Sequence, residues 1–135
     1  MQQARSLHIA KLVMTTERKE KMLFIQYPKC TTCKKAKKWL DDRNLKYEDR
    51  HIKEQNPTYE ELKEWSLRSG LPLKKFFNTS GLLYKSMELK DKLPHMSEDE
   101  QLKLLATDGM LVKRPLLITE TRVLIGFKPA EWEQL

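Results

Sequence analysis

The chain has 135 residues, of which 39% are hydrophobic and 33% are charged, and its formal net charge is +7. This length suits one ordinary domain with a single core. No stretch approaches the ~18 consecutive apolar residues of a membrane helix, and no apolar run near the start is long enough for a secretory signal. We therefore expect a cytoplasmic protein that has no contact with a membrane.

The positive charge is unevenly distributed. Residues 1–21 hold five Lys/Arg and two Asp/Glu, which leaves a net charge of +4 for the other 114 residues. That excess is too small to favour direct binding to nucleic acid. Residues 1–21 have no clean periodicity, so we expect a disordered extension, with a short amphipathic helix around Leu7–Val13 as the alternative. Residues 22–135 are expected to form a single domain.

The first elements after this extension alternate between strand and helix. A strand is predicted over Leu23–Tyr27 and a second strand over Tyr47–Ile52. Between them, Ala36, Trp39 and Leu40 recur at helical spacing, which predicts a helix over Lys34–Arg43.

The middle of the chain favours several helices, some of them short. Ser or Thr three residues before Glu forms a capping box at a helix start. The predicted helices are one from the Thr58/Glu61 capping box to Gly70, two short ones at Lys74–Asn78 and Tyr84–Leu89, and one from the Ser97/Glu100 capping box to near Gly109.

The last elements are a hairpin and a helix. Strands are predicted at Leu116–Thr119 and Val123–Ile125, and Pro129 suits the first position of a closing helix. The whole order predicts an α/β fold with a mixed four-stranded sheet flanked by helices. The first βαβ unit should be parallel and right-handed, the hairpin antiparallel, and a helical insertion should separate the two.

Cys30 and Cys33 form a Cys-X-X-Cys motif between the first strand and its helix. The N-terminus of a helix presents unpaired N–H groups and a positive dipole end, which favour a thiolate. The second cysteine, one turn later, can attack a mixed disulfide. We expect Cys30 to be the nucleophile and Cys33 the resolving thiol of a redox disulfide, with Lys34 and neighbouring lysines adding positive charge.

Two other roles for these cysteines compete with redox chemistry. Cysteine is often a buried, inert core residue. Structural zinc needs four ligands, and the chain offers only His8, His51 and His95 besides the cysteines, all isolated from one another. We therefore expect no metal and no bound cofactor. The lysines after Cys33 also fit an ordinary solvated helix face.

Arg114 and Pro115 directly precede the third predicted strand. A proline cannot donate a hydrogen bond to a neighbouring strand, so it marks the strand start. Both a cis and a trans Arg114–Pro115 bond are compatible with the sequence.

Three segments resemble the arsenate reductase/Spx family, a branch of the thioredoxin-like fold with a helical insertion. They are Tyr27–Ala36 with its two cysteines, Gly109–Leu117 with its Arg-Pro pair, and Val123–Phe127. The resemblance covers about residues 22–135. It implies a thioredoxin-like fold and a cis proline at Pro115, beside the cysteines.

The resemblance to arsenate reductases implies a nucleophilic cysteine and three arginines that hold the oxyanion. Cys30 matches the nucleophile and Arg114 matches one arginine. Asn78 and Lys128 stand where the other two arginines are expected. Asn carries no charge and Lys lacks the bidentate fork of Arg, so efficient arsenate reduction is not expected.

The Cys-X-X-Cys pair resembles that of Spx, a redox-switched regulator that binds the α subunit of RNA polymerase. The sequence thus leaves three hypotheses: a thiol–disulfide oxidoreductase, which we favour, a redox-sensing regulator that binds RNA polymerase, or an arsenate reductase. The expected partner of the oxidoreductase is a thiol reductant, namely thioredoxin, glutaredoxin or a low-molecular-weight thiol.

Overall fold

The computed structural model describes residues 21–135. The extension expected over residues 1–21 and the alternative helix around Leu7–Val13 lie outside this range, apart from Lys21. The strands are β1 (Met22–Gln26), β2 (Glu48–His51), β3 (Leu116–Thr119) and β4 (Val123–Ile125). The α-helices are α2 (Thr31–Asp42), α3 (Tyr59–Ser69), α4 (Leu82–Ser86), α5 (Leu89–Lys92), α6 (Glu98–Leu105) and α7 (Pro129–Trp132). Short 3-10 helices are η1 (Leu73–Phe76), η2 (Leu93–His95) and η3 (Gly109–Leu111).

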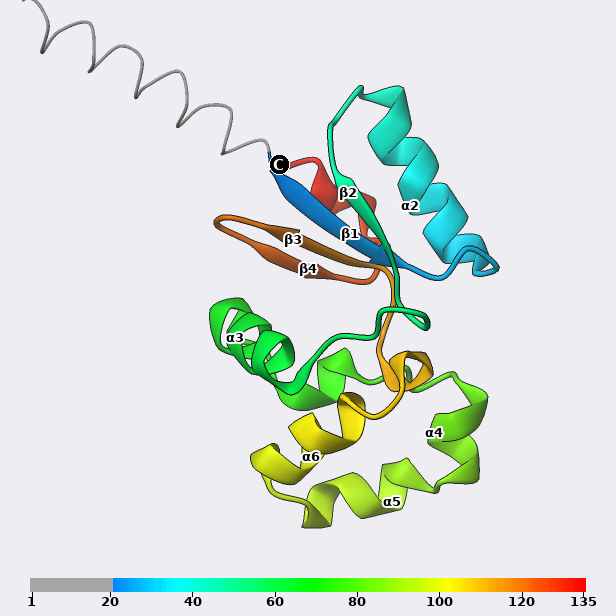
Figure 1. Ribbon diagram of the computed structural model, residues 1–135, viewed down its shortest axis with the longest axis vertical. Helices are drawn as coiled ribbons and strands as arrows, with labels where there is room; N and C mark the ends of the chain where they lie inside the picture. The colour runs from blue at the N-terminus through cyan, green and yellow to red at the C-terminus, as the bar shows by residue number, and fades with distance from the viewer. Residues whose placement is uncertain (1–20) are drawn as a thin grey trace, which may run out of the picture.

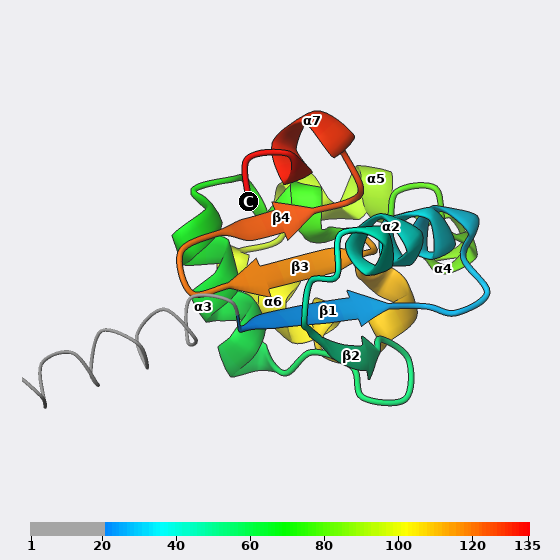
Figure 2. The same ribbon diagram turned by 90° about the horizontal axis from the view of Figure 1, so that it is seen from above.

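The four strands form one mixed sheet in the order β2-β1-β3-β4 (Figures 1 and 2). β1 and β2 are parallel, whereas β1–β3 and β3–β4 are antiparallel. Ile25 pairs with Leu116, which in turn pairs with Ile125. The end of β1, the start of β3 and the end of β4 therefore meet at one edge of the sheet, and this confirms the predicted sheet.

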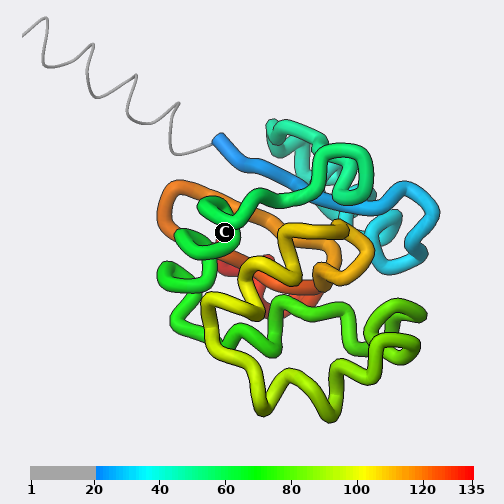
Figure 3. The backbone as a smooth tube through the Cα atoms, turned by 60° about the horizontal axis from the view of Figure 1, so that its bottom comes forward, coloured from blue at the N-terminus to red at the C-terminus, as the bar shows by residue number. Residues whose placement is uncertain are grey.

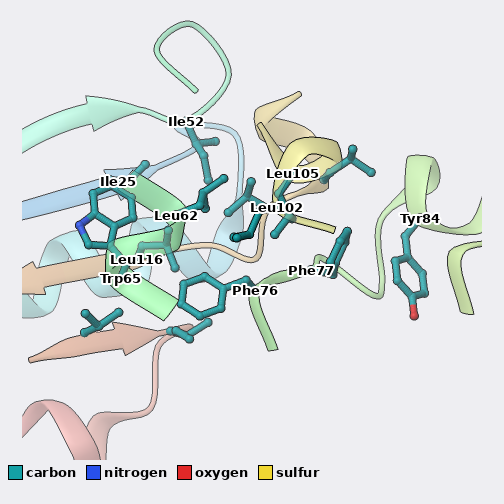
Figure 4. Packing of buried hydrophobic residues seen from close by; sticks show 14 of the residues in the cluster. Ile25, Ile52, Leu62, Trp65, Phe76, Phe77, Tyr84, Leu102, Leu105 and Leu116 are labelled. Carbon is teal, nitrogen blue, oxygen red and sulfur yellow. The ribbon is translucent and has the colours of Figure 1, made fainter. Parts of the chain in front are cut away.

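Alternate residues of the strands face two separate hydrophobic clusters, as the pleat of a strand requires. Phe24 joins Ala36 and Leu40 of α2 and Trp132 of α7 on one face. Ile25, on the other face, joins the helical insertion. Figure 1 shows α2 on one side of the sheet and α3 to α6 on the other. Figure 4 shows the second cluster, where the side chains of the insertion pack toward the sheet.

The helical insertion between β2 and β3 is confirmed (Figure 3). Both predicted capping boxes are formed. Gly70 ends α3 in the left-handed region, at φ 66°. Three finer predictions in this region were wrong, and the structure shows the cause of each.

The segment predicted as a helix at Lys74–Asn78 is the 3-10 helix η1, because Phe77 turns to extended backbone and pairs with Val112. The helix predicted at Tyr84–Leu89 is split into α4 and α5 by Glu88, whose φ is 55°. Helix α6 ends at Leu105 rather than near Gly109, because Asp108 accepts a hydrogen bond from the Met110 N–H and starts η3.

The insertion is held to the sheet at two close contacts. Arg50 of β2 donates to both carboxylate oxygens of Glu61 in α3, at 2.7 and 2.9 Å. At Gly109, a Cβ atom would lie only 1.8 Å from the carbonyl oxygen of Ile52, so no larger residue fits between η3 and the end of β2. Within residues 21–135, no helix is both long and apolar enough to cross a membrane.

Candidate active site

Cys30 occupies the N-cap position of α2, with extended backbone at φ −85° and ψ 124°. Its N–H donates to the carbonyl of Tyr27 at 2.9 Å, which closes a tight turn after β1. Its own carbonyl accepts from the N–H of Lys34 at 3.0 Å, the first hydrogen bond of the helix. The helix thus begins three residues earlier than the sequence predicted, and Cys30 stands at its positive end.

The two thiols differ in exposure. Cys33 is fully buried, whereas Cys30 is half-buried, and both are free thiols in this structure. A reagent arriving from solvent therefore meets Cys30 first.

The surroundings move the pKa values of the two thiols in opposite directions. Burial alone would raise the pKa of Cys30, but the backbone N–H and side chain of Cys33 and the guanidinium of Arg114 outweigh it and lower the pKa. The Cys30 sulfur makes no full capping hydrogen bond, yet it lies close enough to the Cys33 N–H for that dipole to favour the thiolate. Burial, aided by the negative charge of Cys30, raises the pKa of Cys33 to about 12.

Arg114 supplies the positive charge at this site. It follows Lys113, whose N–H donates to the carbonyl of Phe76 in η1. The Arg114–Pro115 peptide bond is cis, which is one of the two alternatives that the sequence left open. The Pro115 carbonyl accepts from the Gly126 N–H at 2.8 Å. The Nε and Nη1 atoms of Arg114 are buried and have no hydrogen-bond partner among the described residues. Arg114 therefore keeps unused hydrogen-bond donors near Cys30.

The ring of Tyr27 lies under Arg114, with the guanidinium carbon 5.2 Å from the ring centroid. His51 of β2 also contacts this ring in an edge arrangement, with centroids 5.6 Å apart. Sequence analysis did not assign Tyr27 a role at the site. Its only signal was its place directly before Pro28, because the contact with Arg114 joins residues 87 positions apart.

The remaining candidates, Asn78 and Lys128, make contacts with other parts of the chain. The N–H of Asn78 donates to the Leu111 carbonyl at 2.8 Å, and its side chain packs against Gly81. The Lys128 side chain is 67% exposed and lies 3.8 Å from Glu131. Neither contributes to the altered pKa of either thiol.

The lysines after Cys33 belong mainly to a solvated helix face. Lys34 is exposed. Lys37 pairs with Asp41 at 3.3 Å and Lys38 with Asp42 at 2.7 Å. Among charged side chains, Arg114 is the one that lowers the pKa of Cys30, and a role for Lys34 stays a prediction. Among the described residues, no group of three or more His, Cys, Asp or Glu side chains is arranged to hold a metal ion.

A mixed sheet, a Cys-X-X-Cys motif at the first helix and a cis proline before the third strand define a thioredoxin-like protein. The family model of the ArsC family matches residues 25–135. The chain belongs to the ArsC family.

Three relatives illustrate the similarity of this chain to known proteins. The chain is 56% identical over 113 residues to the uncharacterized protein YusI of Bacillus subtilis, covering 84% of this chain and 96% of YusI. It is 30% identical to the regulatory protein MgsR of Bacillus subtilis, over 83% of this chain and 87% of MgsR. It is 28% identical to the global transcriptional regulator Spx 1 of Bacillus cereus, over 77% of this chain and 78% of that protein.

Two solved structures share the fold over 84% of this chain. An ArsC family related protein from Bacteroides fragilis is 62% identical, with a TM-score of 0.82 over 95% of its own chain. A possible arsenate reductase from Streptococcus mutans is 47% identical, with a TM-score of 0.78 over 96% of its chain.

Proposed function

We propose that this chain is a thiol–disulfide oxidoreductase of the ArsC family that works through the Cys30–Cys33 pair. The observation that carries the proposal is the asymmetry of the two thiols: Cys30 is half-exposed with a lowered pKa, and Cys33 is buried with a pKa raised to about 12. This asymmetry makes Cys30 the more readily ionised thiol and keeps Cys33 protonated at neutral pH.

The reaction has two exchange steps. The Cys30 thiolate attacks one sulfur of a partner disulfide, so that a Cys30–partner bond forms, the partner's S–S bond breaks, and one partner sulfur leaves as a thiolate and takes a proton from water. Cys33 then loses its proton and attacks Cys30, which forms the Cys30–Cys33 disulfide and releases the second partner thiolate. The partner gains two electrons and two protons, and this chain is oxidised by two electrons.

The pKa of Cys33 sets the order of these steps. Part of its elevation comes from the charge and hydrogen bonding of Cys30. Once Cys30 is bound to the partner it carries no charge, so this part is removed and Cys33 ionises more readily. A thiol reductant, namely thioredoxin, glutaredoxin or a low-molecular-weight thiol, would then reduce the disulfide and return the pair to its starting state.

Cys33→Ser provides the test. This variant lacks the resolving thiol, so incubation with an oxidised peptide should trap a stable Cys30–peptide disulfide that mass spectrometry detects. The wild-type chain should instead release the reduced peptide and hold one internal disulfide. Cys30→Ser is the control and should do neither. Release of reduced peptide by Cys33→Ser at the wild-type rate, or a peptide trapped on Cys33, would contradict the proposal.

A regulatory role is the second candidate, because two relatives are named regulators. In that role the same disulfide would act as a switch, and the α subunit of RNA polymerase would be the partner. Binding of that subunit by the oxidised but not the reduced chain would favour it.

Arsenate reduction is the third candidate, supported by the two unpaired donors of Arg114 beside Cys30. With Asn78 and Lys128 at the other two positions, we expect slow turnover at best. Arsenate turnover that is lost in Cys30→Ser and in Arg114→Ala would favour this role.

A further inference from the structure

A cavity of about 550 Å³ opens at the same edge of the sheet as Cys30. Four lysines line it, from three separate parts of the fold. Lys74 and Lys75 come from η1, Lys113 from the segment before β3, and Lys128 from the start of α7. We refer to this cavity as the lysine cleft.

The lysine cleft carries uncompensated positive charge. Glu131 is its acidic lining residue, and it lies 3.8 Å from Lys128. Lys74, Lys75 and Lys113 form no ion pair with any residue in the described part of the chain. Lys37, Lys38 and Lys103, by contrast, each have a carboxylate within 4 Å. What distinguishes the cleft is that its four lysines line one cavity.

Apolar surface lies between these charges. Phe77 and Ile125 contribute to the lining, and Leu71, which is 45% exposed, adds a large apolar side chain. A ligand that fills the lysine cleft would therefore combine several negative groups with carbon-rich surface.

The topology places the lysine cleft at the edge of the sheet where the segment that carries Cys30 begins. Cys30 follows β1, Lys113 and Arg114 precede β3, and Lys128 follows β4, all at the edge where Ile25, Leu116 and Ile125 are paired. Neighbouring strands are about 4.8 Å apart, so β4 lies roughly 10 Å from β1. An extended peptide advances about 3.3 Å per residue and would cover this distance in about three residues.

We propose that the lysine cleft binds an acidic segment of the partner polypeptide, three to five residues away from the cysteine that reacts with Cys30. The inference rests on the proposed function, because it specifies the partner of the same site. It predicts that disulfides flanked by Asp or Glu at this spacing are preferred substrates.

The form of the lysine cleft favours a polypeptide over a small anion. The buried, unpaired donors that suit a single oxyanion belong to Arg114, next to the sulfur. The lysines instead come from separate elements around a 550 Å³ space. Charges spread in this way fit several carboxylates along a chain, with the apolar lining available to the side chains between them.

The test compares two peptides, each carrying one cysteine linked by a disulfide to a coloured reporter thiol. One peptide has three Glu residues three to five positions from its cysteine, and the other has Gln at the same positions. Reporter release measures the attack of Cys30. The wild-type chain should react about tenfold faster with the Glu peptide at low salt, and this advantage should fall toward one in about 0.5 M salt.

Two variants with equal loss of charge complete the comparison. Lys74→Gln/Lys75→Gln/Lys113→Gln should reduce the Glu/Gln rate ratio to near one. Lys46→Gln/Lys53→Gln/Lys63→Gln, which changes exposed lysines outside the cleft, should keep the wild-type ratio. A ratio near one in the wild-type chain, or an equal fall in both variants, would overturn the assignment of the cleft.

A binding measurement separates this inference from the proposed function. The fluorescence anisotropy of a labelled Glu peptide without cysteine should rise when the wild-type chain or Cys30→Ser is added. It should not rise when Lys74→Gln/Lys75→Gln/Lys113→Gln is added. If neither reporter peptide reacts but this binding pattern holds, the redox proposal fails and the cleft assignment stands. Equal binding by the cleft variant would refute the cleft assignment whatever the thiols do.

Discussion

Cys30 and Cys33 lie one helical turn apart, yet their surroundings give them opposite tendencies to ionise. Cys30 has the helix N-terminus and Arg114 beside it, whereas Cys33 is enclosed by the core. Each thiol also shifts the pKa of the other, so the reactivity of each is best measured in the variant that lacks its partner.

We predict that Cys30 is alkylated at least about tenfold faster than Cys33 at pH 7, because only a thiolate reacts. The rate of iodoacetamide alkylation against pH in Cys33→Ser and in Cys30→Ser measures this. Cys30 should reach half of its maximal rate at a lower pH than a free cysteine, and Cys33 should stay mostly unreactive up to pH 9. Faster reaction of Cys33 at pH 6 would reverse the assignment of nucleophile.

Tyr27 offers a second prediction, because its ring supports Arg114 from below. Tyr27→Leu removes the ring and its attraction for the guanidinium, which is worth about 0.5–1 kcal/mol at a partly exposed site. We expect a raised pKa of Cys30 and an about two- to fivefold slower reaction with an anionic disulfide reagent.

The control for Tyr27 is Tyr27→Phe, which keeps the ring and should behave as the wild-type chain. A neutral reagent should be slowed less than an anionic one, at a pH where Cys30 is fully ionised. Equal slowing of both reagents would mean that Tyr27 serves only to pack the loop.

Much of the site was predictable from local sequence, because a Cys-X-X-Cys motif before a helix fixes its own geometry. Pro115 was identified from its place before a strand, and Arg114 was assigned to the site by the family resemblance. Tyr27 was not, since its contact with Arg114 depends on the pairing of β1 with β3. The lysine cleft depends in the same way on elements distant in sequence.

At the scale of elements, Glu61 links the N-terminus of α3 to strand β2. It completes the capping box of α3 by accepting from the Thr58 N–H at 3.0 Å, and it binds Arg50 of β2 through both oxygens. The hydrogen bonds from Arg50 outweigh the opposing effect of burial, and together with Thr58 they lower the pKa of Glu61.

We predict that Glu61→Gln lowers the free energy of unfolding at pH 7 by about 1–3 kcal/mol, since charge-assisted hydrogen bonds are lost. A lowered folded-state pKa means that the ionised carboxylate stabilises the fold above the ordinary pKa of Glu, about 4.3, and that this contribution is lost as pH falls through the lower folded-state value. Urea unfolding at pH 7 and near pH 3 should therefore show a smaller difference between wild type and variant at the acidic pH.

Glu60→Gln is the matched control, because Glu60 also lies in the first turn of α3 but makes no ion pair within the described residues. It should change the free energy of unfolding much less. A pH-independent effect of Glu61→Gln would contradict the role given to its charge.

The elements that sequence predicted well are those with local end signals. The capping boxes placed the starts of α3 and α6 correctly, and Gly70 placed the end of α3. The two hairpin strands match their predicted bounds at every residue. The short helices were placed poorly, because η1 ends where Phe77 pairs with Val112, 35 residues later. Such a contact leaves no local signal in the sequence.

At the scale of the molecule, one sheet is shared by two hydrophobic clusters. Neighbouring residues of β1, Phe24 and Ile25, belong to opposite clusters. We propose that residues 22–135 behave as a single cooperative domain, because neither cluster is complete without the strands.

Unfolding with urea tests this cooperativity. Trp65 reports on the insertion, and Trp39 and Trp132 report on the α2 face. Trp65→Phe and Trp39→Phe/Trp132→Phe each leave tryptophan fluorescence from one face. Within each variant, the fluorescence and far-ultraviolet circular dichroism transitions should coincide. An earlier fluorescence transition from the insertion would indicate two units.

The most direct test of the redox pair is its reduction potential. The chain is equilibrated across ratios of reduced to oxidised glutathione, and free thiols are counted after acid quenching. We predict reversible formation of one Cys30–Cys33 disulfide, with a potential between about −180 and −270 mV, the range of known dithiol catalysts. Retention of two free thiols at every glutathione ratio would contradict the redox pair and leave Cys30 as a nucleophile acting alone.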